Sequence, residues 1–314
     1  MNLPAISAAL KPLHLRSCLI SRQGQLVLEH YRDIHTANEI AKINSCTKSL
    51  LSALICIAMD LKLLPGPDIR ISEFFPSLKE DRDERKRNIT LRHLLTMAGG
   101  WNWTEFGGHN SFPRMTRSPD WVRFALEQPM ADQPGDRMEY NSGGSQLLSA
   151  MLVQASGLPT AEFAERYLFG PLGIDAYHWE QDPQGIHTGG FGLSLRPADL
   201  LKFGLLYLHQ GIWKERRLIS SELSTLSVQP AIDVEAPRRG CYAWHWWTDI
   251  YAPELQEAKV EERTGFDYFF AQGYGGQFIY VIPRLDTVVV LTDDKRKKDR
   301  PPVHVFRSYI APYL

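Results

Sequence analysis

The sequence lacks the features that usually mark membrane, secreted and nucleic-acid-binding proteins. No run approaches the roughly 18 apolar residues of a spanning helix, so no membrane segment is expected. The N-terminal stretch has no basic segment followed by an unbroken apolar core, which argues against a secretory signal. The net charge of −1 gives no overall attraction to nucleic acid or to an anionic membrane. These absences predict a cytoplasmic protein without nucleic-acid or membrane partners.

Cysteine is scarce, and the common catalytic signatures are missing. The four cysteines show neither CxxC nor metal-ligand spacing, so they are predicted to be free thiols in a reducing compartment: Cys18, Cys46, Cys56 and Cys241. There is no GxSxG, HExxH, P-loop or GxGxxG motif. These gaps exclude the usual α/β-hydrolase, zinc-peptidase, nucleotidase and Rossmann interpretations. Neither a metal nor an organic cofactor is expected.

Two charged runs are interpreted as solvated surface. EDRDERKR at 80–87 carries charge on every side, which is typical of an exposed segment. KRKKDR at 295–300 has no aromatic platform beside it, so a solvated loop is favoured over a nucleic-acid site.

The secondary-structure signals change along the chain. Residues 15–31 predict a hairpin broken at Arg22-Gln23-Gly24, and a helix apolar nearly all round should run from Ser45 until Pro65-Gly66-Pro67 ends it. Residues 67–180 show short helical patterns between Pro/Gly loops. Strand signals return from about residue 240, in the segments YAWHWWTDIY, FDYFFAQ, QFIYVIP and TVVVLTD. The last two segments are predicted to form a hairpin with its turn at 283–286, and a closing helix is predicted over 303–314.

This order predicts an α+β fold, in which an antiparallel β-sheet is flanked by helices and a mostly helical domain is inserted. The expected sheet domain is discontinuous, formed by residues 1–66 and 181–314. The helical domain spans 67–180, and the active site should lie at the interface of the two. The chain is long enough to bury a large core. Its sequence does not indicate an oligomeric state.

The strongest chemical signal is Ser45-Cys46-Thr47-Lys48, the one place where a lysine follows a serine by three residues. Residues i and i+3 share a helix face, so the ammonium of Lys48 can reach the hydroxyl of Ser45. Burial and the positive end of the helix dipole should both lower the lysine pKa, which makes Lys48 a base beside a nucleophile. On spacing alone, an N-capping serine with an unrelated lysine is the alternative.

Two further segments support a site. Tyr140 stands in the loop PGDRMEYNSGG before a helical run; a nearby lysine should lower its phenol pKa and allow it to move protons. Without such a neighbour it is an ordinary loop tyrosine. The glycines of Gln272-Gly273-Tyr274-Gly275-Gly276-Gln277 let a substrate approach a strand edge, and the N–H groups of Ser45 and Gly276 are predicted to form an oxyanion hole. A plain β-bulge is the alternative there.

Taken in order, these features resemble the serine β-lactamase and penicillin-binding protein superfamily, and within it the class C β-lactamase-like branch. Ser45 and Lys48 match its Ser-x-x-Lys motif, and the resemblance extends over about residues 15–312 through SCTKSLLSALICIA, ITLRHLLTMAGGWNW and GGFGLSLRPADLLKFGLLYLHQGIW. The resemblance implies a β-lactamase/transpeptidase-like fold. Tyr140 then belongs to the Tyr-x-Asn motif, although Ser142 replaces the amide, and Asn141 and Ser142 are expected near the substrate.

The third motif of that family, Lys-Thr-Gly or His-x-Gly, has two candidates. His187-Thr188-Gly189 matches the letters, whereas Gly273-Tyr274-Gly275 matches the setting within the terminal strands. We prefer the second, which lacks the usual cation and so favours uncharged substrates over β-lactams, whose carboxylate needs a partner.

The sequence therefore predicts a serine hydrolase that cleaves a small-molecule ester, amide or lactam through an acyl-enzyme on Ser45. Trp101 and Trp103 are expected either to wall the acyl pocket or to belong to the core. A true β-lactamase, a D-aminopeptidase and a ligand sensor that does not turn over remain alternatives.

Overall fold

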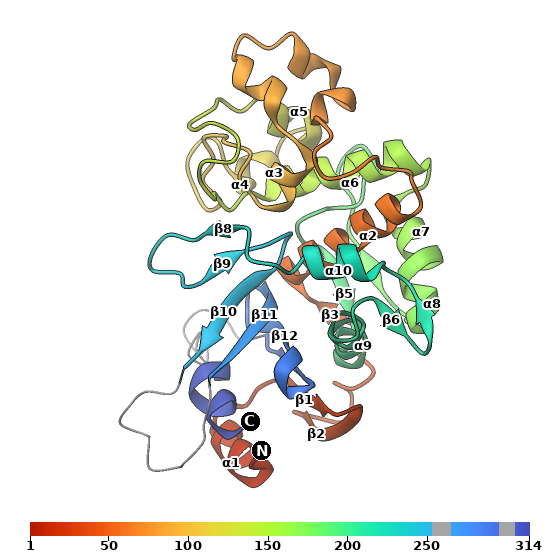
Figure 1. The fold of residues 1–314 in the computed structure, drawn as a ribbon, viewed down its shortest axis with the longest axis vertical. Helices are drawn as coiled ribbons and strands as arrows, with labels where there is room; N and C mark the ends of the chain where they lie inside the picture. The colour runs from red at the N-terminus through yellow and green to blue at the C-terminus, as the bar shows by residue number, and fades with distance from the viewer. Residues whose placement is uncertain (253–264, 295–304) are drawn as a thin grey trace.

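An eight-stranded antiparallel sheet forms the centre of the molecule (Figure 1). The computed structural model describes residues 1–252, 265–294 and 305–314. The strand order is β2-β1-β13-β12-β11-β10-β9-β8, with these bounds: β1 Ser17–Arg22, β2 Gln25–Tyr31, β8 Ile232–Asp233, β9 Cys241–Tyr242, β10 Trp247–Tyr251, β11 Phe266–Gly273, β12 Gln277–Ile282 and β13 Thr287–Thr292. Two smaller sheets comprise β3 Ala41–Lys42, β4 His178–Trp179 and β5 Leu193–Leu195, and β6 Ile212–Trp213 with β7 Arg216–Arg217. The predicted α+β fold with an antiparallel sheet is confirmed.

Helices cover both faces of this sheet. Strands β12 and β13 are buried along their whole length, which matches their β-branched and aromatic composition. Helix α9 (Pro197–Leu208) packs closely on one face, since a Cβ at Gly204 would lie 2.5 Å from Val288 Cγ1. On the other face α1 (Leu3–Leu10) lies beside a π turn (Phe306–Ile310) and a 3₁₀ turn (Ala311–Tyr313). Figure 1 shows both chain ends on this side.

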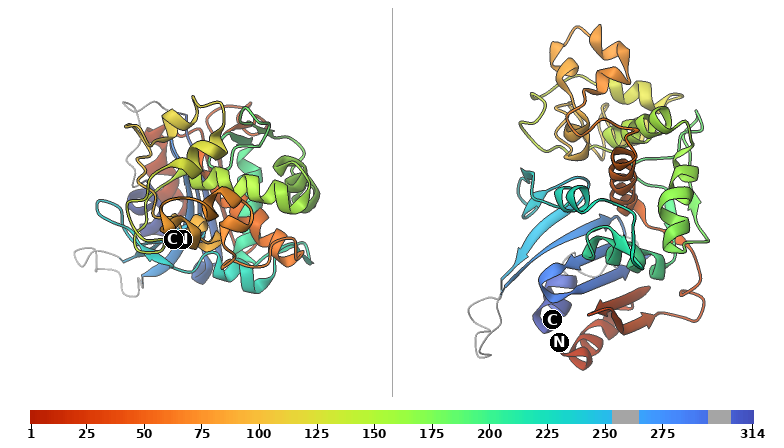
Figure 2. Two further views of the ribbon diagram at one scale, coloured as in Figure 1. Left: turned by 90° about the horizontal axis from the view of Figure 1, so that it is seen from above. Right: turned by 45° about the vertical axis from the view of Figure 1, so that its right-hand side comes forward.

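The remaining helices lie around one end of the sheet. Helix α2 (Thr47–Asp60) has a single residue that is not fully buried, and Figure 2 shows it standing between the sheet and the helices beyond. Figure 1 shows α3, α4, α5 and α6 on the far side. Their bounds, with those of the neighbouring helices, are α3 Leu91–Leu95, α4 Phe112–Met115, α5 Trp121–Glu127, α6 Ser142–Ser156, α7 Thr160–Ala164, α8 Gly170–Leu172 and α10 Ser221–Leu226. Within the described parts of the chain, no helix has the length and apolarity to cross a membrane.

The local predictions have mixed outcomes. The hairpin of β1 and β2 is confirmed, with Gln23 and Gly24 at its turn in left-handed conformations. The predicted end of the long helix at Pro65 is wrong. The helix ends at Asp60, because Lys62 takes a positive φ of 61° and the next two amides donate back to the Ala58 carbonyl. The hairpin of β12 and β13 is confirmed, and turns over 306–313 take the place of a regular closing helix.

The charged segment at 80–87 is not wholly solvated. Lys86 is 4% exposed, and its ammonium donates to Asp81 Oδ2 at 2.8 Å and to the Leu126 carbonyl at 2.9 Å. The lysine side chain is thus buried while its charge is paired, and no local sequence pattern indicates this contact. The run at 295–300 lies outside the described residues. All four cysteines are free, as predicted.

Candidate active site

The site begins where a short 3₁₀ turn, Asn44–Cys46, leads into α2. Ser45 sits in this turn, and Lys48 lies on the first turn of the helix that follows. The spacing of three residues brings Lys48 Nζ to 3.3 Å from Ser45 Oγ. The predicted juxtaposition of a serine hydroxyl with a lysine amine is therefore present.

Lys48 is buried at 1% exposure and contacts three oxygen atoms. Besides Ser45 Oγ, its Nζ donates to Ser142 Oγ at 3.0 Å and to the Gly190 carbonyl at 2.8 Å. Burial lowers the lysine pKa to about 8, against the smaller opposing effect of the Glu105 carboxylate. The downward direction agrees with the prediction. A substantial fraction of Lys48 is thus neutral near pH 8 and able to accept a proton.

Tyr140 lies against Lys48, but its protonation differs from the prediction. The Lys48 ammonium stands 4.8 Å from the centre of the tyrosine ring, and the Ser45 hydroxyl hydrogen-bonds to the phenol. Burial raises the tyrosine pKa, and the negative Glu105 raises it further. The expectation of a lowered pKa is therefore wrong, because burial and the Glu105 charge outweigh the lowering effects of the Ser45 hydrogen bond and of Arg238. Tyr140 is a phenol that can donate a proton rather than a resident phenolate.

The two residues after Tyr140 are buried and hydrogen-bonded within the protein. The Asn141 side chain accepts from the Gly144 amide at 3.0 Å and so caps the N-terminus of α6. Ser142 is 3% exposed, and its hydroxyl lies between Lys48 Nζ and the carboxylate of Glu105. The substrate-binding role predicted for Asn141 and Ser142 is thus not supported by their placement. Ser142 belongs to the surroundings of the lysine.

Glu105 is the site residue that sequence reasoning missed. Its Oε2 accepts from Trp103 Nε1 at 2.8 Å and from the Ser142 amide at 3.0 Å, while Oε1 accepts from the Ser142 hydroxyl. It lies two residues beyond the segment ITLRHLLTMAGGWNW, and nothing in WTEFGG indicates a buried carboxylate.

The two tryptophans before Glu105 are core residues. Trp101 is 3% exposed in the main hydrophobic cluster, with its ring over the Gly99 backbone. Trp103 packs with Met115 and Trp121 and holds Glu105 through its indole N–H. Of the two roles left open for them, the core role matches this packing.

The glycine turn after β11 meets the segment that carries the nucleophile. A Cβ at Gly273 would lie 2.2 Å from the Ile43 carbonyl and 3.2 Å from the Ser45 amide nitrogen, so only glycine fits there. Pairing of β10 with β11 runs from Phe266 to Phe270, which leaves the edge of residues 271–273 open on that side. Gly276, the predicted oxyanion donor, instead faces Asp293. A Cβ added at Gly276 would lie 2.9 Å from the Cβ of Asp293. The structure thus brings Gly273, not Gly276, to Ser45.

His187-Thr188-Gly189 lies elsewhere. The His187 ring hydrogen-bonds Gln181 at 3.2 Å and packs against Trp179, and a Cβ at Gly189 would clash with the Ser145 carbonyl. Only the following residue, Gly190, reaches Lys48. This placement favours Gly273-Tyr274-Gly275 as the third motif, with the Tyr274 side chain largely exposed.

An aromatic groove adjoins Tyr140. The Tyr140 ring stacks on Trp247 at 6.0 Å, and the Arg238 guanidinium lies 5.4 Å from the Tyr140 ring and 5.2 Å from that of Trp247. From there a cavity of about 440 Å³ extends over one face of the sheet. Its lining includes Trp247, Tyr268, Phe270, Gln272, Phe278 and Tyr280.

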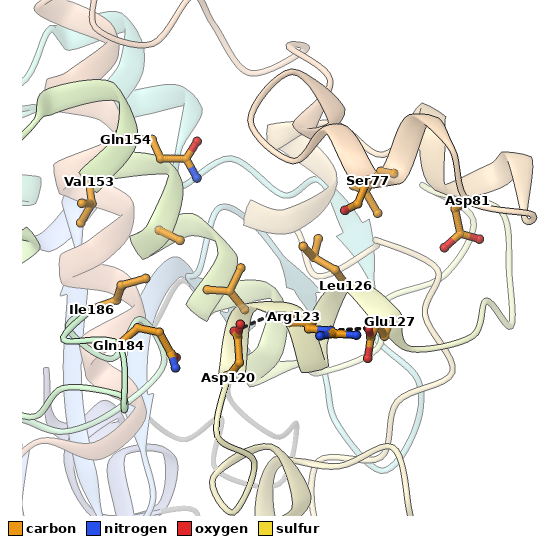
Figure 3. A pocket seen from close by; sticks show the side chains of 13 residues that line it. Ser77, Asp81, Asp120, Arg123, Leu126, Glu127, Val153, Gln154, Gln184 and Ile186 are labelled. Carbon is orange, nitrogen blue, oxygen red and sulfur yellow. Dashed lines mark hydrogen bonds and ion pairs between the residues drawn. The ribbon is translucent and has the colours of Figure 1, made fainter.

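A second cavity, of about 680 Å³, lies on the helical side (Figure 3). Its wall is charged, and Figure 3 shows Arg123 between Asp120 and Glu127, with the guanidinium 2.6 Å from Glu127 Oε1. None of the described residues that line it hydrogen-bonds to Ser45 or Lys48 or stacks on the Tyr140 ring, as Trp247 of the aromatic groove does, so its larger volume does not make it the site of the chemistry.

A sequence model of the Beta-lactamase family matches residues 17–305. The chain belongs to this family. Its fold is typical of serine hydrolases, and the expected family resemblance is confirmed. No curated protein matches the sequence.

Solved structures of the same fold are distant in sequence. EstCE1, described as a hydrolase with promiscuous acyltransferase activity, has a TM-score of 0.76 at 14% identity, covering 99% of each chain. An octameric penicillin-binding protein homologue from Pyrococcus abyssi has a TM-score of 0.75 at 20% identity over 99% of this chain and 77% of its own. A class C beta lactamase from Rhodobacter sphaeroides has a TM-score of 0.69 at 14% identity, over 99% and 97%. At such identities the likeness shows the fold alone.

Proposed function

We propose that this protein is a serine hydrolase that cleaves carboxylic ester or amide bonds through a covalent acyl-enzyme on Ser45. The observation that carries the proposal is the buried Lys48 amine, 3.3 Å from Ser45 Oγ and with its pKa lowered to about 8. A neutral amine at that distance is a general base for a serine nucleophile.

The reaction follows from the positions of the groups. Lys48 takes the proton of Ser45 as Oγ attacks the substrate carbonyl. The oxyanion accepts from the Ser45 N–H and from an N–H of the turn that Gly273 begins, in place of the Gly276 donor expected at first. The Tyr140 phenol protonates the leaving oxygen or nitrogen and is reprotonated from Lys48. Water then attacks the acyl group, gives a proton to Lys48 and releases the acid, while Ser45 regains its proton.

The surroundings favour neutral substrates with an apolar or aromatic group. Six of the residues that line the groove beside Tyr140 are aromatic, which suits an acyl or alcohol substituent of that kind. Four others are charged, and of these Arg307 is paired with Asp249 at 2.8 Å. The turn at Gly273–Gly275 supplies neither an ammonium nor an imidazole. The guanidinium of Arg238 is placed against the Tyr140 and Trp247 rings. Esters and amides are therefore proposed over β-lactams.

Mass spectrometry after treatment with a fluorophosphonate tests the proposal. Ser45 should carry the label, Ser45→Ala should remain unlabelled, and Lys48→Met should label far more slowly. Ser52→Ala is the matched control, since Ser52 lies on the same helix and its hydroxyl has no hydrogen-bond partner. Absence of label on Ser45, or full ester hydrolysis by Ser45→Ala, would refute the mechanism.

Turnover assays separate the remaining alternatives. Short-chain p-nitrophenyl esters and a chromogenic cephalosporin are compared at equal enzyme concentration. Preferential hydrolysis of the cephalosporin would make the protein a β-lactamase. An acyl adduct that persists for hours without steady product release would identify a ligand sensor.

A further inference from the structure

The nitrogen of Lys48 faces three oxygens, and the direction of each hydrogen bond decides whether it can act as a base. A neutral amine has two hydrogens and one lone pair. The Gly190 carbonyl can only accept, so it takes one hydrogen at 2.8 Å. The hydroxyls of Ser142, at 3.0 Å, and Ser45, at 3.3 Å, can each donate or accept. Only if Ser142 accepts does the lone pair point to Ser45.

Glu105 removes this ambiguity at Ser142. Its Oε2 is held by two N–H donors, the indole of Trp103 and the backbone amide of Ser142. Its Oε1 then meets the Ser142 hydroxyl, and a carboxylate oxygen accepts. The single hydrogen of Ser142 is committed to Glu105, so Ser142 Oγ offers Lys48 only lone pairs.

We infer that Glu105 is a positioning residue that acts through Ser142 to fix the lone pair of Lys48 on the hydroxyl of Ser45. The inference rests on the proposed function, because it concerns the base of that reaction. Glu105 contacts Ser142 rather than Ser45 or Lys48, so it orients the base through Ser142 and otherwise acts on it only through its charge. The burial of both residues, Ser142 at 3% and Glu105 at 9% exposure, keeps water from offering competing hydrogen bonds.

Substitution Glu105→Gln reverses the chain of hydrogen bonds. The amide oxygen keeps the place of Oε2, where two donors point, so the NH₂ group faces Ser142 Oγ and donates to it. The Ser142 hydroxyl then donates to the lone pair of Lys48, and a lysine N–H faces Ser45. We expect kcat for a p-nitrophenyl ester to fall about 100-fold, the usual effect of losing a general base, with KM nearly unchanged.

A rescue experiment separates this effect from a merely structural one. Ser142→Ala leaves nothing to donate into the lone pair, so its loss of kcat should be smaller than that of Glu105→Gln. The double variant Glu105→Gln/Ser142→Ala should recover the activity of Ser142→Ala alone. If the double variant is no faster than Glu105→Gln, the inference is overturned.

The pH profile provides a second readout. The negative charge of Glu105 raises the pKa of Lys48. Glu105→Gln should therefore move the rise of kcat/KM to lower pH than in the wild type. If kcat/KM of Glu105→Gln rises at the same pH as that of the wild type, or if its kcat is not lowered, the inference is contradicted.

Asp182→Asn is the matched control. Asp182 is a second buried carboxylate that bonds a residue of α6, since its Oδ2 accepts from Gln146 Nε2 at 2.9 Å. Its neutralisation should lower the melting temperature without changing kcat.

Fluorophosphonate labelling of Ser45 separates failure of the inference from failure of the proposed function. A wild type that is not labelled at Ser45 refutes the proposed function. Equal labelling rates in the wild type and Glu105→Gln refute only the role of Glu105.

Discussion

The side-chain amide of Asn44 donates to the carbonyl of Tyr274 at 2.6 Å, which ties the residue before the nucleophile to the turn at the end of β11. Two segments far apart in sequence are thereby held in one arrangement. Asn44 itself adopts a positive φ of 49°, a conformation that asparagine tolerates better than most residues. The proposed oxyanion hole depends on this junction, because one donor comes from each side of it.

Gly273→Ala tests the junction. The added Cβ would lie 2.2 Å from the Ile43 carbonyl, so the turn and the Ser45 segment have to move apart. We expect kcat to fall by about 100-fold, as after loss of an oxyanion donor, and stability to fall by about 1–3 kcal/mol from overpacking. Gly144→Ala is the control, because the nearest atom to its new Cβ is at an ordinary contact distance of 3.7 Å. Steady-state kinetics and thermal melts of both variants measure the difference.

The pH dependence of the wild type reports on Lys48. Its pKa is lowered to about 8, and the neutral form is the proposed base. The value of kcat/KM should therefore rise with pH and level off above a midpoint near 8. A profile that is flat from pH 6 to pH 10 would mean that Lys48 does not act as the base.

The same buried amine makes stability depend on pH. The folded-state pKa is about 8, against 10.5 for a lysine exposed to solvent, so below pH 8 the charged lysine destabilises the fold by about 3 kcal/mol. Because the unfolded chain keeps its proton to higher pH, this contribution to stability rises between pH 8 and 10.5. Urea titrations should show that rise in the wild type and not in Lys48→Met, which should be the more stable variant at pH 7.

Tyr140→Phe should slow the substrates that need a protonated leaving group. An alkoxide leaves poorly without a proton, whereas p-nitrophenolate leaves readily. We expect kcat to fall by about 100-fold for an alkyl ester and by much less for a p-nitrophenyl ester. Tyr242→Phe changes a neighbouring ring, 6.5 Å from that of Tyr140, and should leave both rates unchanged. An equal loss on both esters in Tyr140→Phe would argue against proton donation.

Much of the fold follows from local patterns. Alternating and β-branched runs predict β1, β2, β12 and β13, and an apolar helix that starts beside Ser45 predicts α2. The spacing of three residues predicts the contact between Ser45 and Lys48. Such patterns can be recognised in a single sequence because the residues that interact lie within a few positions of one another.

The missed features depend on partners distant in the chain. Glu105 meets a residue 37 positions later, and Lys86 is buried against a carbonyl 40 positions later. The sequence shows that residues 273, 275 and 276 are glycines but not which of them approaches Ser45, so the predicted donor, Gly276, differs from Gly273, which the structure brings there. The pKa of Tyr140 was misjudged for the same reason, since desolvation by the surrounding fold outweighs the one neighbour considered.

The residues of the proposed site are far apart in the sequence, so they are synthesised at different times, and the last of them determines when activity can begin. Ser45 and Lys48 leave the ribosome early, Ser142 and Gly190 follow, and Gly273 comes only after most of the protein has been made. A nascent chain that ends before β11 has the nucleophile and its base but lacks one half of the oxyanion hole. Hydrolysis of a fluorogenic ester by stalled chains of increasing length should therefore appear in one late step, when β12 and β13 have emerged and joined β11 to β1 in the sheet.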